Sequence, residues 1–110
     1  MPDPRAEQIT RIIDAIEGEL RRLDLWEQAP PPARALMSEQ PFCFDTLTFT
    51  QWLQWVFVVR VRLILSENLE LPDVSDIHPL AEHAFQPLDY DSGRLLELIR
   101  QFDVLINNAG

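Results

Sequence analysis

The chain contains no lysine, and each of its nine basic residues is an arginine. Without lysine the protein cannot form a Schiff base on its own side chains, and it has neither a phosphate-loop lysine nor a lysine general base. Its three glycines do not form a glycine-rich phosphate loop. These absences exclude several common enzyme classes before any motif is considered.

Cysteine is nearly absent too, because Cys43 stands alone and cannot form an internal disulfide. Its neighbours Phe42 and Phe44 predict a buried, inert thiol rather than a nucleophile. The longest apolar run, 52–65, is too short for a bilayer and is interrupted by polar residues. The N-terminus lacks the features of a signal peptide, so we expect a cytoplasmic protein with no membrane contact.

Histidine is scarce, and the two histidines do not have the spacing of a metal site. His78 and His83 are five residues apart, which puts them on different sides of a helix, and Pro79 lies between them. Paired carboxylates such as Glu17 and Glu19, or Asp73 and Asp76, are expected in a chain this acidic, so they indicate no general acid or base. We therefore predict no metal, no cofactor and no catalytic residue.

Acidic residues outnumber basic ones, 18 to 9, which gives a formal net charge of -9 at pH 7. This charge repels nucleic acid phosphates, and the arginines do not cluster enough to overcome the repulsion. We expect no direct nucleic acid binding. Docking of this acidic protein on a basic protein partner remains open.

A length of 110 residues with 46% hydrophobic content fits one globular domain, residues 1–110, whose core needs no metal or disulfide. Apolar residues recur at three- and four-residue steps in three long stretches, and no stretch alternates as a strand would. A short helix is expected over 79–85, and the last long helix begins near residue 91. The sequence thus predicts an all-α protein, a small antiparallel bundle of three long helices and one short helix.

The first long helix should begin after Asp3, a capping residue, with Pro4 at its first position, and should end near Leu25 or Trp26. Three consecutive prolines then predict an ordered, extended loop with space for a helical turn over 33–37. The apolar stripe of the first helix consists of Ile9, Ile12, Ile13, Ile16, Leu20 and Leu23.

The second long helix has two independent start signals. Thr48 and Gln51 have the spacing of a capping box, and Leu47 and Trp52 have that of a hydrophobic staple. We expect this helix to run to about Asn68.

The stretch QPFCFDTLTFTQWLQWVFVVR, residues 40–60, concentrates aromatic residues on and before this helix. At about 100° per residue, Trp55 and Val58 share a side with Gln51 and Gln54. One interpretation is a central helix buried on most sides by the rest of the bundle. The other is a partner-binding face, because exposed aromatic anchors are enriched in binding hot spots.

Arg60 falls in the middle of the apolar arc of the same helix. A guanidinium keeps its charge, so burial there demands a carboxylate or several carbonyl oxygens, and Asp45 and Glu67 are the candidate carboxylates. A buried ion pair that fixes the loop to the helix is the first interpretation. Contact with an anion or a partner is the second, and a buried stem with a solvated head is the third.

The segments QPFCFDT and WLQWV, followed by Arg60, resemble the signature of the YqcC-like family of small bacterial proteins of unknown function. The likeness extends to Trp26 and to the Leu71–Pro72 pair. It implies an all-α bundle and a gene often found beside a tRNA pseudouridine synthase gene, and it carries over no catalytic residue. The shared positions in the central segment are Gln40, Pro41, Phe42, Asp45, Thr46, Trp52, Leu53, Trp55, Val56 and Arg60.

The sequence thus favours a non-enzymatic protein-protein interaction module, linked through the gene context of its family to tRNA modification. A pocket for a small molecule or anion near Arg60 is the alternative, and a homodimeric structural protein is a further one. The predicted partner or ligand surface consists of Phe42, Asp45, Trp55, Val58 and Arg60.

Overall fold

The computed structural model describes residues 3–86 and 91–108, and within these ranges it contains helices and no strand. Its elements, in chain order, are α1 (Ala6–Arg22), α2 (Ala33–Leu36), the 3-10 turn η1 (Pro41–Cys43), α3 (Phe49–Trp52), the π-helix η2 (Leu53–Val58), α4 (Val59–Ser66), α5 (His78–Phe85) and α6 (Gly93–Asn107). Helices α3, η2 and α4 follow one another without a break. The all-α prediction is therefore confirmed, with three long helical stretches and the short α5 in the expected places.

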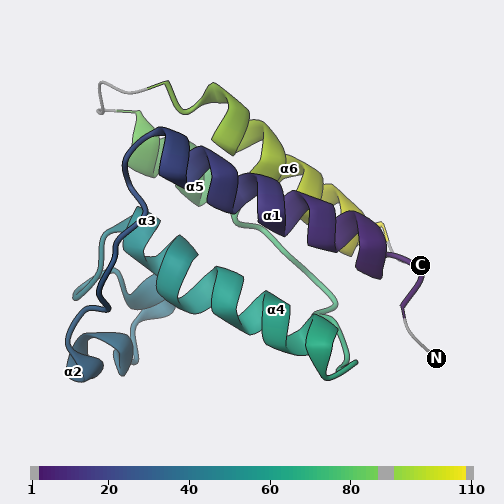
Figure 1. Cartoon of the computed structure of the whole chain (residues 1–110), viewed down its shortest axis with the longest axis horizontal. Coiled ribbons are helices and arrows are strands. Elements are labelled where there is room, and N and C mark those ends of the chain that lie inside the picture. The colour runs from purple at the N-terminus through teal and green to yellow at the C-terminus, as the bar shows by residue number, and fades with distance from the viewer. Residues whose placement is uncertain (1–2, 87–90, 109–110) are drawn as a thin grey trace.

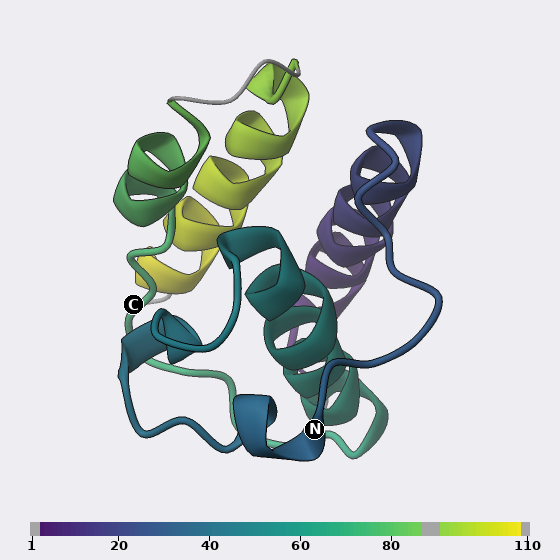
Figure 2. The same ribbon diagram turned by 90° about the vertical axis from the view of Figure 1, so that its left-hand side faces the viewer.

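Helix α1 is the central contact of the bundle. It packs against α6 on one side and against η2 and α4 on the other, while α5 packs against α6. Figure 1 shows that α1 runs in the opposite direction to both α4 and α6. In the turned view of Figure 2, α5 and α6 lie together on the left, α1 lies on the right, and the α3–α4 helix lies in the lower middle.

The core forms from the apolar stripes that the sequence predicts. On α1, Ile9, Ile16 and Leu20 are fully buried, and on α6, Leu95 and Phe102 are buried to the same degree or nearly so. Each large apolar side chain removed from water contributes about 1.5–3 kcal/mol before entropy is counted. The stripes therefore supply the main force that holds α1 and α6 together.

Helix α1 ends earlier than the sequence predicts. Asp24 adopts a left-handed backbone with φ 61°, and the N–H of Leu25 donates to the carbonyl of Leu20 at 2.8 Å. This is a Schellman ending, in which a left-handed residue lets the chain turn back on its own last helical turn. Asn68, with φ 53°, ends α4 in the same way.

The start of the second long helix is as predicted. The N–H of Gln51 donates to Thr48 Oγ1 at 3.2 Å, and the N–H of Thr48 donates to Gln51 Oε1 at 2.9 Å. Both halves of the capping box are thus present, and two N–H groups at the helix start have partners. The box fixes where α3 begins and hence how the aromatic stretch is oriented.

The π-helix η2 was not predicted, and it changes the expected position of Arg60. In a π-helix the hydrogen bonds span five residues, so its turn is wider and the following residues are rotated relative to a uniform α-helix. Val58 is turned inward and is 1% exposed, whereas Arg60 is turned outward and is exposed. The burial of Val58 agrees with the first interpretation of this helix, as a buried element of the bundle, and not with the open face. The interpretation that Arg60 is buried is wrong.

Candidate functional site

A groove of about 430 Å³ opens between the second long helix, the η1 segment and the residues that precede α5. Four aromatic side chains line it in a continuous series of ring contacts. The ring centroids of Phe42 and Trp52 are 4.7 Å apart, those of Trp52 and Phe57 5.5 Å, and those of Phe57 and Phe102 4.9 Å. The groove therefore has a rigid, aromatic wall drawn from three parts of the chain.

The rim of the groove carries charge of both signs. Arg60 lines it from α4, and Glu70 and Asp76 line it from the connection between α4 and α5. Val74, on the same connection, is 73% exposed and adds an apolar edge. The groove can therefore hold an apolar group while the rim contacts a charged one.

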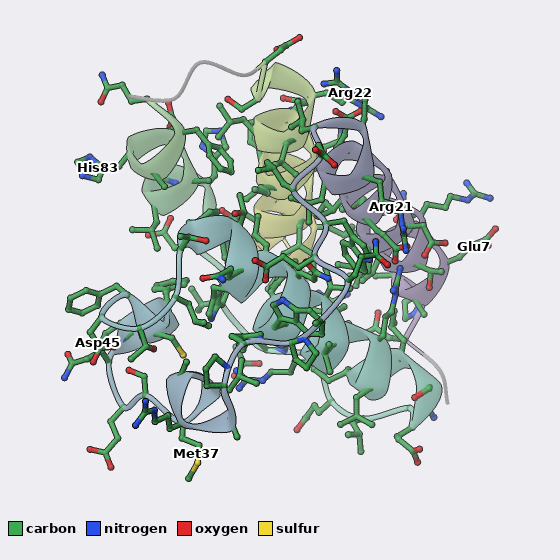
Figure 3. All side chains as sticks on the ribbon, turned by 60° about the vertical axis from the view of Figure 1, so that its left-hand side comes forward. Glu7, Arg21, Arg22, Met37, Asp45 and His83 are labelled. Atoms are coloured by element: carbon green, nitrogen blue, oxygen red, sulfur yellow. The ribbon has the colours of Figure 1, made fainter. Side chains whose placement is uncertain are left out.

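Arg60 makes no ion pair with Asp45 or Glu67, the two carboxylates predicted to bind it, nor with another described residue. Asp45 instead accepts a hydrogen bond from Ser38 Oγ at 2.5 Å. Figure 3 shows Asp45 at the outer edge of the η1 segment. The interpretation of a buried ion pair is wrong, and the guanidinium is available at the groove.

The connection from α4 to α5, residues 67–77, carries four exposed carboxylates, which we call the acidic loop. None of the four makes an ion pair or a side-chain hydrogen bond with another residue that the structure describes. They recur every three residues along the loop, at Glu67, Glu70, Asp73 and Asp76. Their charges repel one another and leave a negative potential beside the groove.

The end of the acidic loop is fixed by the buried carboxylate of Asp103 on α6. Asp103 accepts hydrogen bonds from Ser75 Oγ at 2.6 Å and from the N–H groups of Ile77 at 3.1 Å and His78 at 2.8 Å. A carboxylate at this place satisfies N–H groups at the start of α5 and complements its dipole. It also holds the groove-side residues of the loop in place.

Asn107, one turn further along α6, fixes the same loop by a carboxamide clamp, a side-chain amide that bonds both the N–H and the C=O of one residue. The N–H of Ser75 donates to Asn107 Oδ1 at 2.8 Å, and Asn107 Nδ2 donates to the carbonyl of Ser75 at 2.7 Å. These two hydrogen bonds have the pattern of one residue pair in a β-ladder, with the side-chain amide in place of a second strand. Asn107 itself is exposed.

A second carboxamide clamp lies on the other side of the helix, at Glu27. Its N–H donates to Gln54 Oε1 and its carbonyl accepts from Gln54 Nε2, both at 2.8 Å. The carboxylate of Glu27 accepts a hydrogen bond from Trp55 Nε1 at 2.9 Å and another from Gln51 Nε2 at 3.2 Å. No local pattern predicts these contacts, because they join residues far apart in the chain.

The structure therefore divides the five residues of the predicted surface. Phe42 and Arg60 both line the groove, and Asp45 is not among its lining residues. Trp55 and Val58 line a smaller hollow of about 260 Å³ on the Glu27 side, and the indole N–H of Trp55 already has a partner. The groove is thus a better candidate for recognition than the face predicted around Trp55.

Ion pairs dominate the surface of α1. Glu7, Asp14, Glu17 and Glu19 each contact an arginine. Burial raises the pKa of Glu17, but hydrogen bonds from Arg21 and Arg62 outweigh that effect and leave the pKa lowered. Hydrogen bonds from Arg5 lower the pKa of Asp3 to about 2, and those from Arg100 and Gln101 lower the pKa of Glu97 to about 2. 

Within the described ranges, no three His, Cys, Asp or Glu side chains gather in a group that could hold a metal. Figure 3 shows His83 projecting outward from α5. The thiol of Cys43 is buried. None of the helices described here is long and apolar enough to cross a membrane.

Together, the fold and the groove define a small all-α bundle with an aromatic recess whose rim carries charge of both signs and adjoins the acidic loop. The chain belongs to the YqcC-like family: the family model DUF446, described as tRNA pseudouridine synthase C, matches residues 8–105. The solution NMR structure of protein YqcC from Escherichia coli superposes with a TM-score of 0.84 at 25% identity, covering 98% of this chain and 92% of that one. The predicted family and fold are both confirmed.

Two relatives that resemble this chain in sequence extend the family comparison. An uncharacterized protein of Haemophilus influenzae is 33% identical over 101 residues, which is 92% of this chain and 94% of that protein. A protein of Pectobacterium carotovorum named tRNA pseudouridine synthase C is 38% identical over 68 residues. That match covers 62% of this chain but 18% of the much longer relative.

Proposed function

We propose that this protein is a non-enzymatic module that docks on a tRNA pseudouridine synthase. The observation that carries the proposal is the match to a segment of the Pectobacterium protein named tRNA pseudouridine synthase C, with 82% of that relative outside the match. Two units joined in one chain in one organism commonly act together when they are separate in another. The partner proposed here is therefore the tRNA pseudouridine synthase C of the organism that makes this protein, which we call the synthase.

The groove supports a docking role. Protein interfaces concentrate their binding energy in a few aromatic and arginine residues at recesses that exclude water. Phe42, Trp52 and Arg60 supply such residues at one recess. The ring contacts hold the wall in one arrangement, so little conformational entropy is lost when a partner binds.

The test is a binding titration of the purified protein into the purified synthase by isothermal calorimetry. We expect a complex with a dissociation constant of about 1 μM or tighter, equivalent to about -8 kcal/mol. The rate of pseudouridine formation on tRNA, measured with and without the protein, shows whether docking alters the synthase. If mixing the two proteins at about 50 μM each gives no heat of binding, and the two do not co-elute from a size-exclusion column, the proposal is overturned.

A small apolar anion is a second candidate for the groove. It is favoured by Arg60, whose guanidinium lines the groove and pairs with no described carboxylate. The volume of about 430 Å³ also lies within the range of small-molecule sites, about 300–1,000 Å³. Thermal-shift screening of aromatic carboxylates against wild type and Arg60→Gln tests this. Equal shifts in both proteins would exclude an anion site at Arg60.

A further inference from the structure

We propose that the groove and the acidic loop together bind a basic amphipathic segment of the synthase, with an apolar side chain in the groove and arginine or lysine against the loop. This inference rests on the proposed function and names the chemistry of the partner surface. The occupant is a protein segment, and its recognition has an apolar half and an electrostatic half.

The apolar half comes from the groove itself. Its aromatic wall and the exposed Val74 leave a recess that apolar side chains can fill, and filling it removes apolar surface from water on both partners at roughly 25 cal/mol per Å². Phe42 and Trp52 meet edge to face, so they present both a ring face and a ring edge. A large aliphatic or aromatic anchor matches this recess.

The electrostatic half comes from a contrast within the molecule. Each acid on α1 contacts an arginine, whereas the four carboxylates of the acidic loop contact no arginine among the described residues. Four unpaired charges at three-residue spacing, two of them on the groove rim, cost repulsion in the free protein. A cationic partner relieves that repulsion, so the loop favours a basic occupant over an acidic one.

The proposed partner provides such a surface. A protein that acts on tRNA must neutralise phosphates, and it does so with clustered arginine and lysine. The chain itself has a formal net charge of -9, so long-range attraction would bring the two proteins together at a rate that salt reduces. Charge complementarity therefore selects a basic segment of the synthase.

Arg60 fixes the direction of the bound segment. It lies on the rim with Glu70 and Asp76, and it is the cation among the charged residues that line the groove. A segment whose basic residues contact the acidic loop avoids repulsion only if an acidic residue or a carbonyl faces Arg60. The rim thus has one positive and one negative side.

The experiment compares two double variants that remove the same charge. Glu70→Gln with Asp76→Asn removes two carboxylates from the groove rim. Asp24→Asn with Glu39→Gln removes two exposed carboxylates elsewhere, neither of which contacts a described arginine. Both variants should keep the wild-type circular dichroism spectrum and unfolding temperature, which shows that any change in binding is not a change in folding.

Binding of each protein to the synthase is measured at about 0.15 M salt, where charges interact over about 8 Å, and at about 1 M, where they interact over about 3 Å. We expect the rim variant to bind roughly tenfold more weakly at low salt and the control less than threefold. The difference between rim variant and wild type should shrink at high salt. Val74→Ser should weaken binding at both salt concentrations, and Leu63→Ser, an exposed residue on the outer face of α4, should not.

The outcomes separate this inference from the proposed function. No binding by wild type overturns the proposed function and this inference with it. Binding by wild type with equal losses in the rim and control variants overturns the inference alone, since net charge would then be sufficient. If Leu63→Ser weakens binding to the synthase and Val74→Ser does not, the inference is overturned and the interface lies on the outer face of α4.

Discussion

The two long connections of the molecule are held in the same way but treat their charges differently. The connection after α1 is fixed by the clamp of Gln54 on Glu27, and the connection after α4 by the clamp of Asn107 on Ser75. The carboxylate of Glu27 is bound by the side chains of the neighbouring helix, Trp55 among them. The four carboxylates of the acidic loop have no such partners among the described residues.

This difference separates residues that hold the fold together from residues that are free to contact another molecule. Buried polar groups need partners, and the first connection supplies them internally. Exposed carboxylates without a partner among the described residues add little to stability, so under the proposed function the charge of the second connection is available to a partner. The first connection is therefore expected to matter for folding and the second for binding.

The largest expected effect separates the two tryptophans of the second long helix. Trp52 is 9% exposed and touches the rings of Phe42, Phe49 and Phe57. Trp52→Ala should lower the free energy of unfolding by about 3–5 kcal/mol because it leaves a cavity among these rings. Trp55→Ala should lower it by about 1–2 kcal/mol, because Trp55 is partly exposed and loses one hydrogen bond. Urea unfolding followed by circular dichroism measures the free energy of unfolding of both variants. Equal losses of stability would show that Trp55, on the Glu27 side, is as buried as Trp52 on the groove side.

A smaller effect distinguishes the two clamps. Gln54 is 3% exposed, so Gln54→Ala leaves the N–H and C=O of Glu27 with little access to water and should cost about 2–3 kcal/mol. Asn107 is exposed, so water can replace its amide, and Asn107→Ala should cost about 1 kcal/mol or less. Chemical denaturation of the two variants gives the comparison. A larger loss at Asn107 would mean that the second connection, not the first, limits stability.

The smallest effect concerns pH and the ion pairs of α1. The pKa of Glu17 is lowered in the folded protein, so its pairing stabilises the fold above the ordinary pKa of 4.5 and is lost as pH falls through the lower, folded value. Glu17 contacts both Arg21 and Arg62, and the second contact joins α1 to α4. Glu17→Gln should reduce the loss of stability on acidification below pH 4.5. Thermal unfolding at several pH values measures this loss. Glu70→Gln is the matched change at a carboxylate of the acidic loop. An identical effect of the two substitutions would contradict the contrast between α1 and the acidic loop.

Local patterns in the sequence predicted much of the fold because their causes are local. The capping box of Thr48 and Gln51 needs residues three apart, and the apolar stripe of α1 needs a period of three to four. The position of Arg60 could not be predicted, because the π-helix rotates everything that follows it and has no comparable pattern. The error for Val58 has another cause: Val58 lies on the side of Gln54 as expected, but that side packs into the bundle and both residues are buried.

The candidate site was predicted less well than the fold. Phe42 and Arg60 were placed on the predicted surface and do meet at the groove, but Phe57, Phe102 and the acidic loop were not predicted. These residues come from separate parts of the chain, and their proximity depends on how α6 and the acidic loop pack. The spacing of the loop carboxylates was visible in the sequence, whereas their lack of partners required the structure.

The most direct test of the account follows the amide and indole signals of this protein by NMR while unlabelled synthase is added. Shifts and broadening should concentrate at Arg60, Val61 and Ile64, at residues 70–77 and at the indole N–H of Trp52, all of which line the groove or the acidic loop. Signals from the outer face of α1 and from Trp55 should change little. Changes confined to Trp55 and the outer face of α4, with residues 70–77 unaltered, would contradict the claim that the groove and the acidic loop form the docking surface.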